Sequence, residues 1–255
     1  MSIDPVIIAE RIAKRFEIHH NRAYSLKARI LSSVMPRFRP RVEEFWALRD
    51  VDLRIGRGEA VGLVGRNGSG KSTLLKVIAG IHRPTEGRVL VRRGATISTM
   101  IELGVGFHPE LSGRENVYLN ASVYGLTRAD VDRIYDAVVD YSEIAQFIDE
   151  PIKNYSSGMV MRLAFAVAAH LDPEVLLLDE IFAVGDEAFQ AKCRQTMMQF
   201  IDKGRTVVFV SHSAESVQQI CTRACVLSGG RKMFDGEVAE ALALYHSMEN
   251  GHATT

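Results

Sequence analysis

The sequence predicts an α/β fold, in which a mainly parallel sheet forms the core and a helical subdomain is inserted into it. The first observation is a set of short apolar runs that alternate with helical stretches, as in a buried parallel sheet. The expected strands are 60–64, 175–178 and 206–210. The second observation is a long region with almost only helical pattern and no convincing strand. Its expected helices are 114–124, 128–148 and 159–170.

These patterns divide the chain into three parts. We predict a first part of the core at 1–103, a helical subdomain at 104–171, and a second part of the core with a C-terminal helix at 172–255. A locally basic segment at 17–45 interrupts the first part. Within it, apolar residues at 26–35 fall near helical spacing, which is consistent with a short amphipathic helix. Such a segment can pack on its own domain, or it can contact lipid headgroups or a membrane partner.

Composition excludes several classes of protein. Lys plus Arg and Asp plus Glu both number 31, so no overall charge recruits nucleic acid or an anionic membrane. The apolar runs are far shorter than the roughly 20 residues that cross a bilayer, and no secretory signal is evident. Cys193, Cys221 and Cys225 lack the paired spacing of a zinc site, which indicates buried free thiols in a reduced, cytoplasmic setting.

Residues 65–72 read Gly-Arg-Asn-Gly-Ser-Gly-Lys-Ser and match the phosphate-binding pattern G-x-x-x-x-G-K-S/T. This loop lies between the strand expected at 60–64 and a helix expected at 72–79. Glycines let backbone N–H groups turn towards phosphate oxygens, and the helix adds its positive end. Lys71 is expected to bridge the β- and γ-phosphates of ATP, and Ser72 to bind Mg²⁺. The expected nucleotide ligands are Gly65, Asn67, Gly68, Ser69, Gly70, Lys71, Ser72 and Thr73.

Two acids and a histidine directly follow expected strands. Asp179 and Glu180 come after the strand at 175–178, and Ser211 and then His212 come after the strand at 206–210. In open parallel sheets, ligands bind at these carboxyl ends. We expect Asp179 to hold Mg²⁺, Glu180 to act as general base on the attacking water, and His212 to position that water and the γ-phosphate. A plain helix start for the acids and a structural histidine are the alternatives.

Residues 155–159, Tyr-Ser-Ser-Gly-Met, precede a nearly all-apolar helix and are called the signature segment below. At this point the sequence resembles the ABC ATPase family, whose motif here is commonly Leu-Ser-Gly-Gly-Gln. Ser156 and Gly158 match that motif, whereas Tyr155, Ser157 and Met159 depart from it. A simple N-cap for the helix is the alternative reading of the two serines.

The resemblance implies a RecA-like P-loop NTPase core, ATPase activity and a homodimer. In the family, the signature segment of one subunit closes on the γ-phosphate held by the other, which assigns Ser156, Ser157 and Gly158 to the partner's ATP. It also implies that Asp186 is the acid of the loop, 183–186, that crosses the dimer interface.

Two further roles follow from the resemblance. Adenine is expected to stack on Phe16, for which Phe45 and Trp46 are competitors. Glu102 stands where the family usually has a Gln that senses Mg²⁺ and the attacking water, so Glu102 is a candidate metal-site residue.

Residues 102–116, 155–163 and 184–189 look like the ATPases that export lipid-linked polysaccharides, such as O antigens, capsules, teichoic acids and galactans. This resemblance implies an integral membrane permease as partner, a lipid-linked polysaccharide as cargo, a peripheral position on the cytoplasmic side of the membrane, and no nucleic acid. The alternatives are an exporter of lipid, peptide or drug, a soluble ABC-type ATPase acting on DNA or ribosomes, and a small P-loop kinase.

Overall fold

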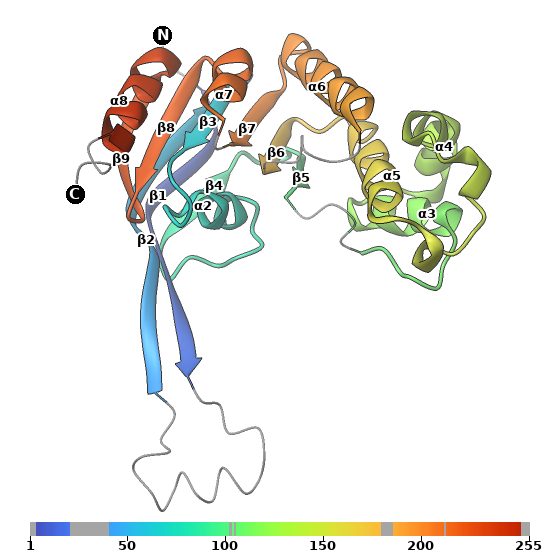
Figure 1. Cartoon of the computed structure of the whole chain (residues 1–255), viewed down its shortest axis with the longest axis horizontal. Helices are drawn as coiled ribbons and strands as arrows, with labels where there is room; N and C mark the ends of the chain where they lie inside the picture. The colour runs from blue at the N-terminus through green and yellow to red at the C-terminus, as the bar shows by residue number, and fades with distance from the viewer. Residues whose placement is uncertain are drawn as a thin grey trace, which may run out of the picture.

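A computed structural model of the chain describes residues 4–20, 41–101, 104, 106–179, 186–211 and 213–250. These residues form a core of two sheets with covering helices, and a separate group of helices lies to one side (Figure 1). The α/β fold class is therefore confirmed.

A six-stranded sheet forms the centre of the core, in the order β5-β6-β7-β3-β8-β9. Its strands are β3 (Ala60–Val64), β5 (Ile97–Met100), β6 (Val175–Asp179), β7 (Thr206–Val210), β8 (Arg223–Ser228) and β9 (Arg231–Glu237). All neighbours are parallel except β8 and β9, which are antiparallel. The three strands expected from apolar runs are confirmed.

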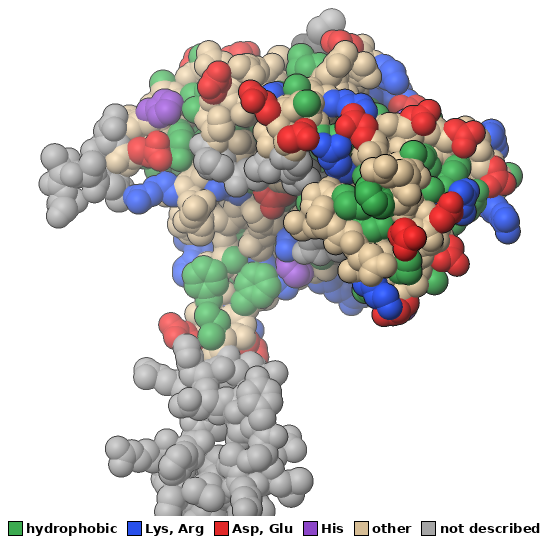
Figure 2. Space-filling model, turned by 45° about the vertical axis from the view of Figure 1, so that its right-hand side comes forward, with side chains coloured by type: hydrophobic (Ala, Val, Ile, Leu, Met, Phe, Trp, Pro, Cys, Tyr) green, Lys and Arg blue, Asp and Glu red, His purple; other side chains and the backbone are tan. Residues whose placement is uncertain are grey.

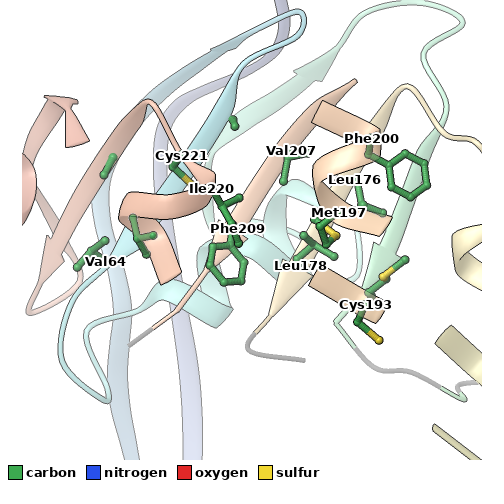
Figure 3. Close-up of a cluster of buried hydrophobic side chains, with 14 of the residues drawn as sticks. Val64, Leu176, Leu178, Cys193, Met197, Phe200, Val207, Phe209, Ile220 and Cys221 are labelled. Atoms are coloured by element: carbon green, nitrogen blue, oxygen red, sulfur yellow. The ribbon is translucent and has the colours of Figure 1, made fainter. Parts of the chain in front are cut away.

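Helices cover both faces of this sheet. One face packs against α2 (Lys71–Ile78), and the other against α6 (Glu187–Asp202), α7 (Ala214–Ile220) and α8 (Val238–Asn250). Because successive strand residues point to opposite faces, Leu177 joins the α2 side and Leu178 the α6 side. Figure 3 shows Leu178 beside Met197 of α6 and near Phe209 of β7. Burial on both faces explains why these strands are apolar throughout.

A second sheet, which the sequence patterns do not predict, has three antiparallel strands in the order β2-β1-β4. Its strands are β1 (Pro5–His20), β2 (Arg41–Gly56) and β4 (Glu86–Val91). β4 pairs with β1 only from Ile7 to Ala13. Residues 14–20 and 41–48 therefore form a two-stranded ribbon, which stands away from the core (Figure 1). The described ends of the basic segment 17–45 are thus strands, and the helix expected at 26–35 lies outside the described residues.

The group of helices lies between β5 and β6 in the chain. It consists of α3 (Gly113–Val123), α4 (Arg128–Ser142), α5 (Ser157–Ala169) and the 3₁₀ turns η2 (Ala145–Phe147) and η3 (Ile152–Asn154). Side-chain oxygens cap all three α-helices, from Ser112, Thr127 and Ser156. The group has its own buried core, which includes Val138 and Leu163. This arrangement supports the proposed subdomain at 104–171.

The helix predicted at 128–148 was wrong in its length, because α4 ends at Ser142. The next residue, Glu143, has a left-handed backbone with φ of 59°. That conformation ends an α-helix and redirects the chain. Ile144 is then only 3% exposed and joins the core of the helical group. Burial of this side chain thus outweighs continuation of the helical pattern.

The state of the cysteines and the search for membrane-spanning helices concern two further predictions. Cys193, Cys221 and Cys225 are buried and form no disulfide, as predicted. Within the described ranges, no helix combines the length and the apolar character that a membrane span requires.

We predict that Phe165→Ala costs about 3–5 kcal/mol of unfolding free energy, because removing a buried ring leaves a cavity. Phe165, on α5, is 2% exposed, and its ring centroid lies 6.0 Å from that of Tyr141 and 6.1 Å from that of Phe189. Urea unfolding measures the change. Val123→Ala, at a residue that is 63% exposed, is the control and should change stability by less than about 0.5 kcal/mol. Equal costs for the two variants would contradict the packing described above.

Candidate functional site

The phosphate-binding loop connects β3 to α2, and at two of its glycines the neighbouring backbone leaves no space for a side chain. A Cβ atom on Gly65 would lie 2.3 Å from the carbonyl oxygen of Leu227, and one on Gly70 would lie 2.6 Å from that of Ala47. Real Cβ atoms do not approach so closely. Gly70 also has φ of 104°, which only glycine adopts without strain. The two glycines are therefore required by neighbouring backbone as well as by the ligand that the pattern predicts.

Backbone hydrogen bonds hold this loop against the turn between β8 and β9. The Gly230 N–H donates to the carbonyl of Ser69 at 3.1 Å, and the Arg49 N–H donates to the carbonyl of Gly230 at 2.7 Å. β2, the turn and the loop are thus joined in one chain of contacts. These contacts set the direction of the loop's N–H groups before any ligand arrives.

Lys71 is buried, with 7% of its surface exposed. Its Nζ donates to the carbonyl oxygens of Gly65 at 2.6 Å and Arg66 at 3.1 Å. Burial of an ammonium group is costly without such partners. The loop itself therefore supplies oxygens that hold the charge in place, at a point where anionic oxygens can also reach it.

A cavity of about 200 Å³ brings most of the predicted ligands together. The predicted residues that line it are Asn67, Gly68, Gly70, Lys71, Ser72, Thr73 and Asp179, and the others are Phe45, Ala47 and Val210. Asp179 ends β6 and Val210 ends β7, so the cavity lies at the carboxyl ends of these strands. Ser72 and Asp179 offer the hydroxyl and carboxylate oxygens that Mg²⁺ prefers.

Several predicted site residues lie outside the described residues. They are Glu102, Glu180, His212 and the loop residues 183–185. The described neighbours of two of them are well placed, since Asp179 lines the cavity and Ser211, which is 4% exposed, directly follows β7.

The aromatic residue that lines the cavity is Phe45, not Phe16. Phe16 and Phe45 are paired across β1 and β2. The Phe16 ring packs edge-on against His82 at 5.6 Å, with Lys14 Nζ 5.0 Å from its centroid. Phe45 is 49% exposed. Figure 2 shows hydrophobic side chains gathered where the ribbon leaves the body, and Phe45 and Ile18 are the large exposed ones on the ribbon's described residues.

The signature segment starts α5 and lines no part of this cavity. Ser156 caps the helix, because its Oγ accepts the Met159 N–H at 3.2 Å. Ser156 and Ser157 are both exposed. Around Gly158, the nearest atom to an added Cβ is Ser156 Oγ at 3.8 Å, so nothing within the described chain requires a glycine there.

Asp186 begins α6 and is bound from two sides. Its Oδ1 accepts the Phe189 N–H at 2.9 Å, and its Oδ2 meets Nη2 of Arg162 at 2.6 Å. Arg162 also bonds Glu143 at 2.9 Å and lies 4.8 Å from the centroid of the Phe189 ring. Arg162 therefore ties α5 to the start of α6. Sequence reasoning missed it, although an arginine in a nearly all-apolar helix was a usable signal.

Comparison with known proteins relates the chain to one family. Residues 48–183 match the family model described as ABC transporter. The O-antigen export system ATP-binding protein RfbB of Klebsiella pneumoniae is 42% identical over 241 residues, covering 94% of this chain and 97% of that protein. The teichoic acids export ATP-binding protein TagH of Listeria innocua is 36% identical over 239 residues, covering 94% of this chain and 69% of that protein.

Solved structures agree with the fold. The ATP-binding subunit of an ABC transporter matches with a TM-score of 0.73 at 21% identity, over 94% of this chain and 93% of that one. A dimeric ATP-binding cassette in a post-hydrolysis state, bound to ADP and Pi, matches with a TM-score of 0.69 at 22% identity, over 91% of this chain and 98% of that one.

We predict that Lys71→Ala weakens binding of ATP about 100-fold, because charged hydrogen bonds to phosphate contribute about 1.5–3 kcal/mol each. Titration with a fluorescent ATP analogue measures the affinity. Lys76→Ala is the matched control, since Lys76 lies on the same helix but does not line the cavity. Unchanged affinity in Lys71→Ala would remove this cavity as the phosphate site.

Proposed function

The chain belongs to the ABC transporter family, and from that premise we propose that it is the ATP-hydrolysing subunit of an exporter that moves lipid-linked polysaccharide across the cytoplasmic membrane. The cargo is supported by relatives that match almost the whole chain. Their names describe export of O antigen and of teichoic acids, which are both polymers of the cell surface. A separate integral membrane permease provides the path, and this subunit is peripheral on its cytoplasmic side.

The roles within one subunit follow from the cavity that holds Lys71, Ser72 and Asp179 together. The loop's N–H groups and Lys71 bind the phosphates of ATP. Ser72 and Asp179 would hold Mg²⁺, which would supply positive charge to offset the negative charge of the phosphates during hydrolysis. No cluster of three or more His, Cys, Asp or Glu that suits a metal is found among the described residues.

Hydrolysis is assigned to the residues that follow Asp179 and Ser211. Glu180 accepts the proton of the attacking water, and His212 positions that water and the γ-phosphate. In the sequence, both residues come soon after the parallel strands β6 and β7, whose last residues, Asp179 and Val210, line the cavity. Glu102 remains a candidate for the metal site.

A homodimer completes the active site. Among the described residues, none from the helical group lines the cavity, whereas Ser156, Ser157 and Gly158 form a helix start with donors for phosphate. The open surface at Gly158 leaves room for the γ-phosphate of a second subunit. Asp186, held at the start of α6, is placed at the same interface.

Adenine recognition is assigned to the aromatic pair on the ribbon. Because Phe45 lines the cavity and Phe16 lies beside it on β1, we infer that the base stacks on Phe45 and that Phe16 supports it from the neighbouring strand. Phe16 was the expected stacking residue, and the variants below separate the two roles.

We predict that Phe45→Ala weakens ATP binding about three- to tenfold, the range expected for one aromatic stacking contact. Phe16→Ala should have a smaller effect, because the Phe16 ring packs on His82 rather than lining the cavity. ATP and inorganic triphosphate are compared in the same titration, since only ATP carries the base. If Phe16→Ala causes the larger loss for ATP, Phe16 is the stacking residue.

We predict that Glu180→Gln retains ATP but slows hydrolysis at least about 100-fold in the assembled transporter, because a general base contributes 10²- to 10⁴-fold. Cells that carry only this variant should retain lipid-linked glycan at the inner face of the membrane. The measurements are phosphate release by the purified complex and the glycolipid content of the membrane. Hydrolysis at the unmodified rate would rule out Glu180 as the base. Normal glycan export would rule out the proposed cargo.

A further inference from the structure

The exposed serines of the signature segment are directly preceded by Tyr155, whose side chain reaches into the helical group. Ser156 and Ser157 are themselves exposed, so their positions must be set by the chain that leads to them. The segment that leads to the serines is the turn η3, and Tyr155 directly follows its last residue, Asn154. Tyr155 is half-buried, and its N–H donates to the carbonyl of Ile152 at 2.8 Å.

The hydroxyl of Tyr155 enters a niche between η2 and α3. It donates to the carbonyl oxygen of Phe147 at 2.6 Å. A Cβ atom on Gly113 would lie 2.3 Å from this hydroxyl oxygen, so the niche exists only because residue 113 is glycine. Burial raises the pKa of Tyr155 to about 12, so the phenol keeps its proton and remains a donor at neutral pH.

The walls of the niche are rigid. The Gly113 N–H donates to the carbonyl of Glu150 at 3.1 Å, and the Arg114 N–H donates to that of Ile148 at 2.8 Å. α3 therefore holds the segment that contains the acceptor of the tyrosine hydroxyl. The hydrogen bond of its hydroxyl therefore fixes Tyr155, which directly precedes the helix cap Ser156, to the turn η2.

We propose that Tyr155 is a positioning residue for phosphate binding across the dimer, and that Gly113 is its required companion. The proposal rests on the proposed function, because the serines act only when a second subunit presents its ATP. Leucine, common at this place in related motifs, cannot donate a hydrogen bond. This chain therefore anchors the residue before the serines with a hydrogen bond that leucine could not make.

The test uses ATP-driven dimerisation in a Glu180→Gln background, with the affinity of the monomer for ATP as the second readout. Tyr155→Phe should weaken dimerisation about tenfold, because each dimer contains two signature segments that must then be ordered on dimerisation without this hydrogen bond. It should leave ATP binding by the monomer unchanged, since the signature segment does not line the cavity. Sedimentation at several protein concentrations measures the dimer, and nucleotide titration measures the monomer.

Tyr118→Phe is the matched control. Its hydroxyl donates to Asp132 at 2.6 Å within the same helical group, away from the serines. It should reduce thermal stability about as much as Tyr155→Phe while leaving dimerisation unchanged. If both variants weaken dimerisation equally, or if neither does, Tyr155 has no positioning role. If the Glu180→Gln parent fails to dimerise with ATP, the proposed function fails, and this proposal fails with it.

A double-mutant cycle tests the niche directly. Gly113→Ala should lower the melting temperature, because its new methyl group meets the tyrosine hydroxyl. Adding Tyr155→Phe removes that oxygen, so the double variant should melt at a higher temperature than Gly113→Ala alone. Simple additivity of the two losses would show that the two residues do not share the niche.

Discussion

The close approach of three backbone segments around the phosphate-binding loop is the constraint on which the site depends. Gly70 and Gly230 both lie where a Cβ atom would come within 3 Å of the carbonyl oxygen of Ala47. This contact locks β2, the β8–β9 turn and the loop into one arrangement. Because the loop binds phosphate through N–H directions, its affinity requires that these directions be set in advance. The second sheet therefore helps to fix the phosphate-binding loop, although only its edge strand β2 contacts that loop.

The serines that we assign to the partner's phosphate lie on the helical group, which has a core separate from the sheet's two cores. Its mechanical link to the sheet runs through α5 and α6, where Phe165 and Phe189 pack together and Arg162 bonds Asp186. A group with its own core can move as a body relative to the sheet. Closure of a dimer would act on this link, because α5 carries the serines and α6 begins at the interface loop.

Prediction from sequence succeeded where the pattern is local. The buried strands β3, β6 and β7 are continuous apolar runs because both faces are covered, and most residues of the P-loop pattern line one cavity. It failed where pairing is long-range. β4 has mostly exposed residues, and the ribbon of β1 and β2 carries charges on its surface, so neither has the apolar signal of a core strand. The end of α4 was missed because burial of Ile144, rather than local propensity, decides it.

The sequence by itself determined the class of chemistry, because a Gly-rich loop with Lys71 and a carboxylate after a buried strand specify phosphate binding through residue types and spacing alone. Only the tertiary structure decided which aromatic residue reaches the cavity, since Phe45 and Phe16 are cross-strand neighbours with similar sequence signals. It also revealed the ion pair between Arg162 and Asp186 and the close approach of the Tyr155 hydroxyl to Gly113. These contacts join residues 24 and 42 positions apart, that is 186 − 162 and 155 − 113. No periodicity or motif encodes such pairs, because packing between separate helices creates them.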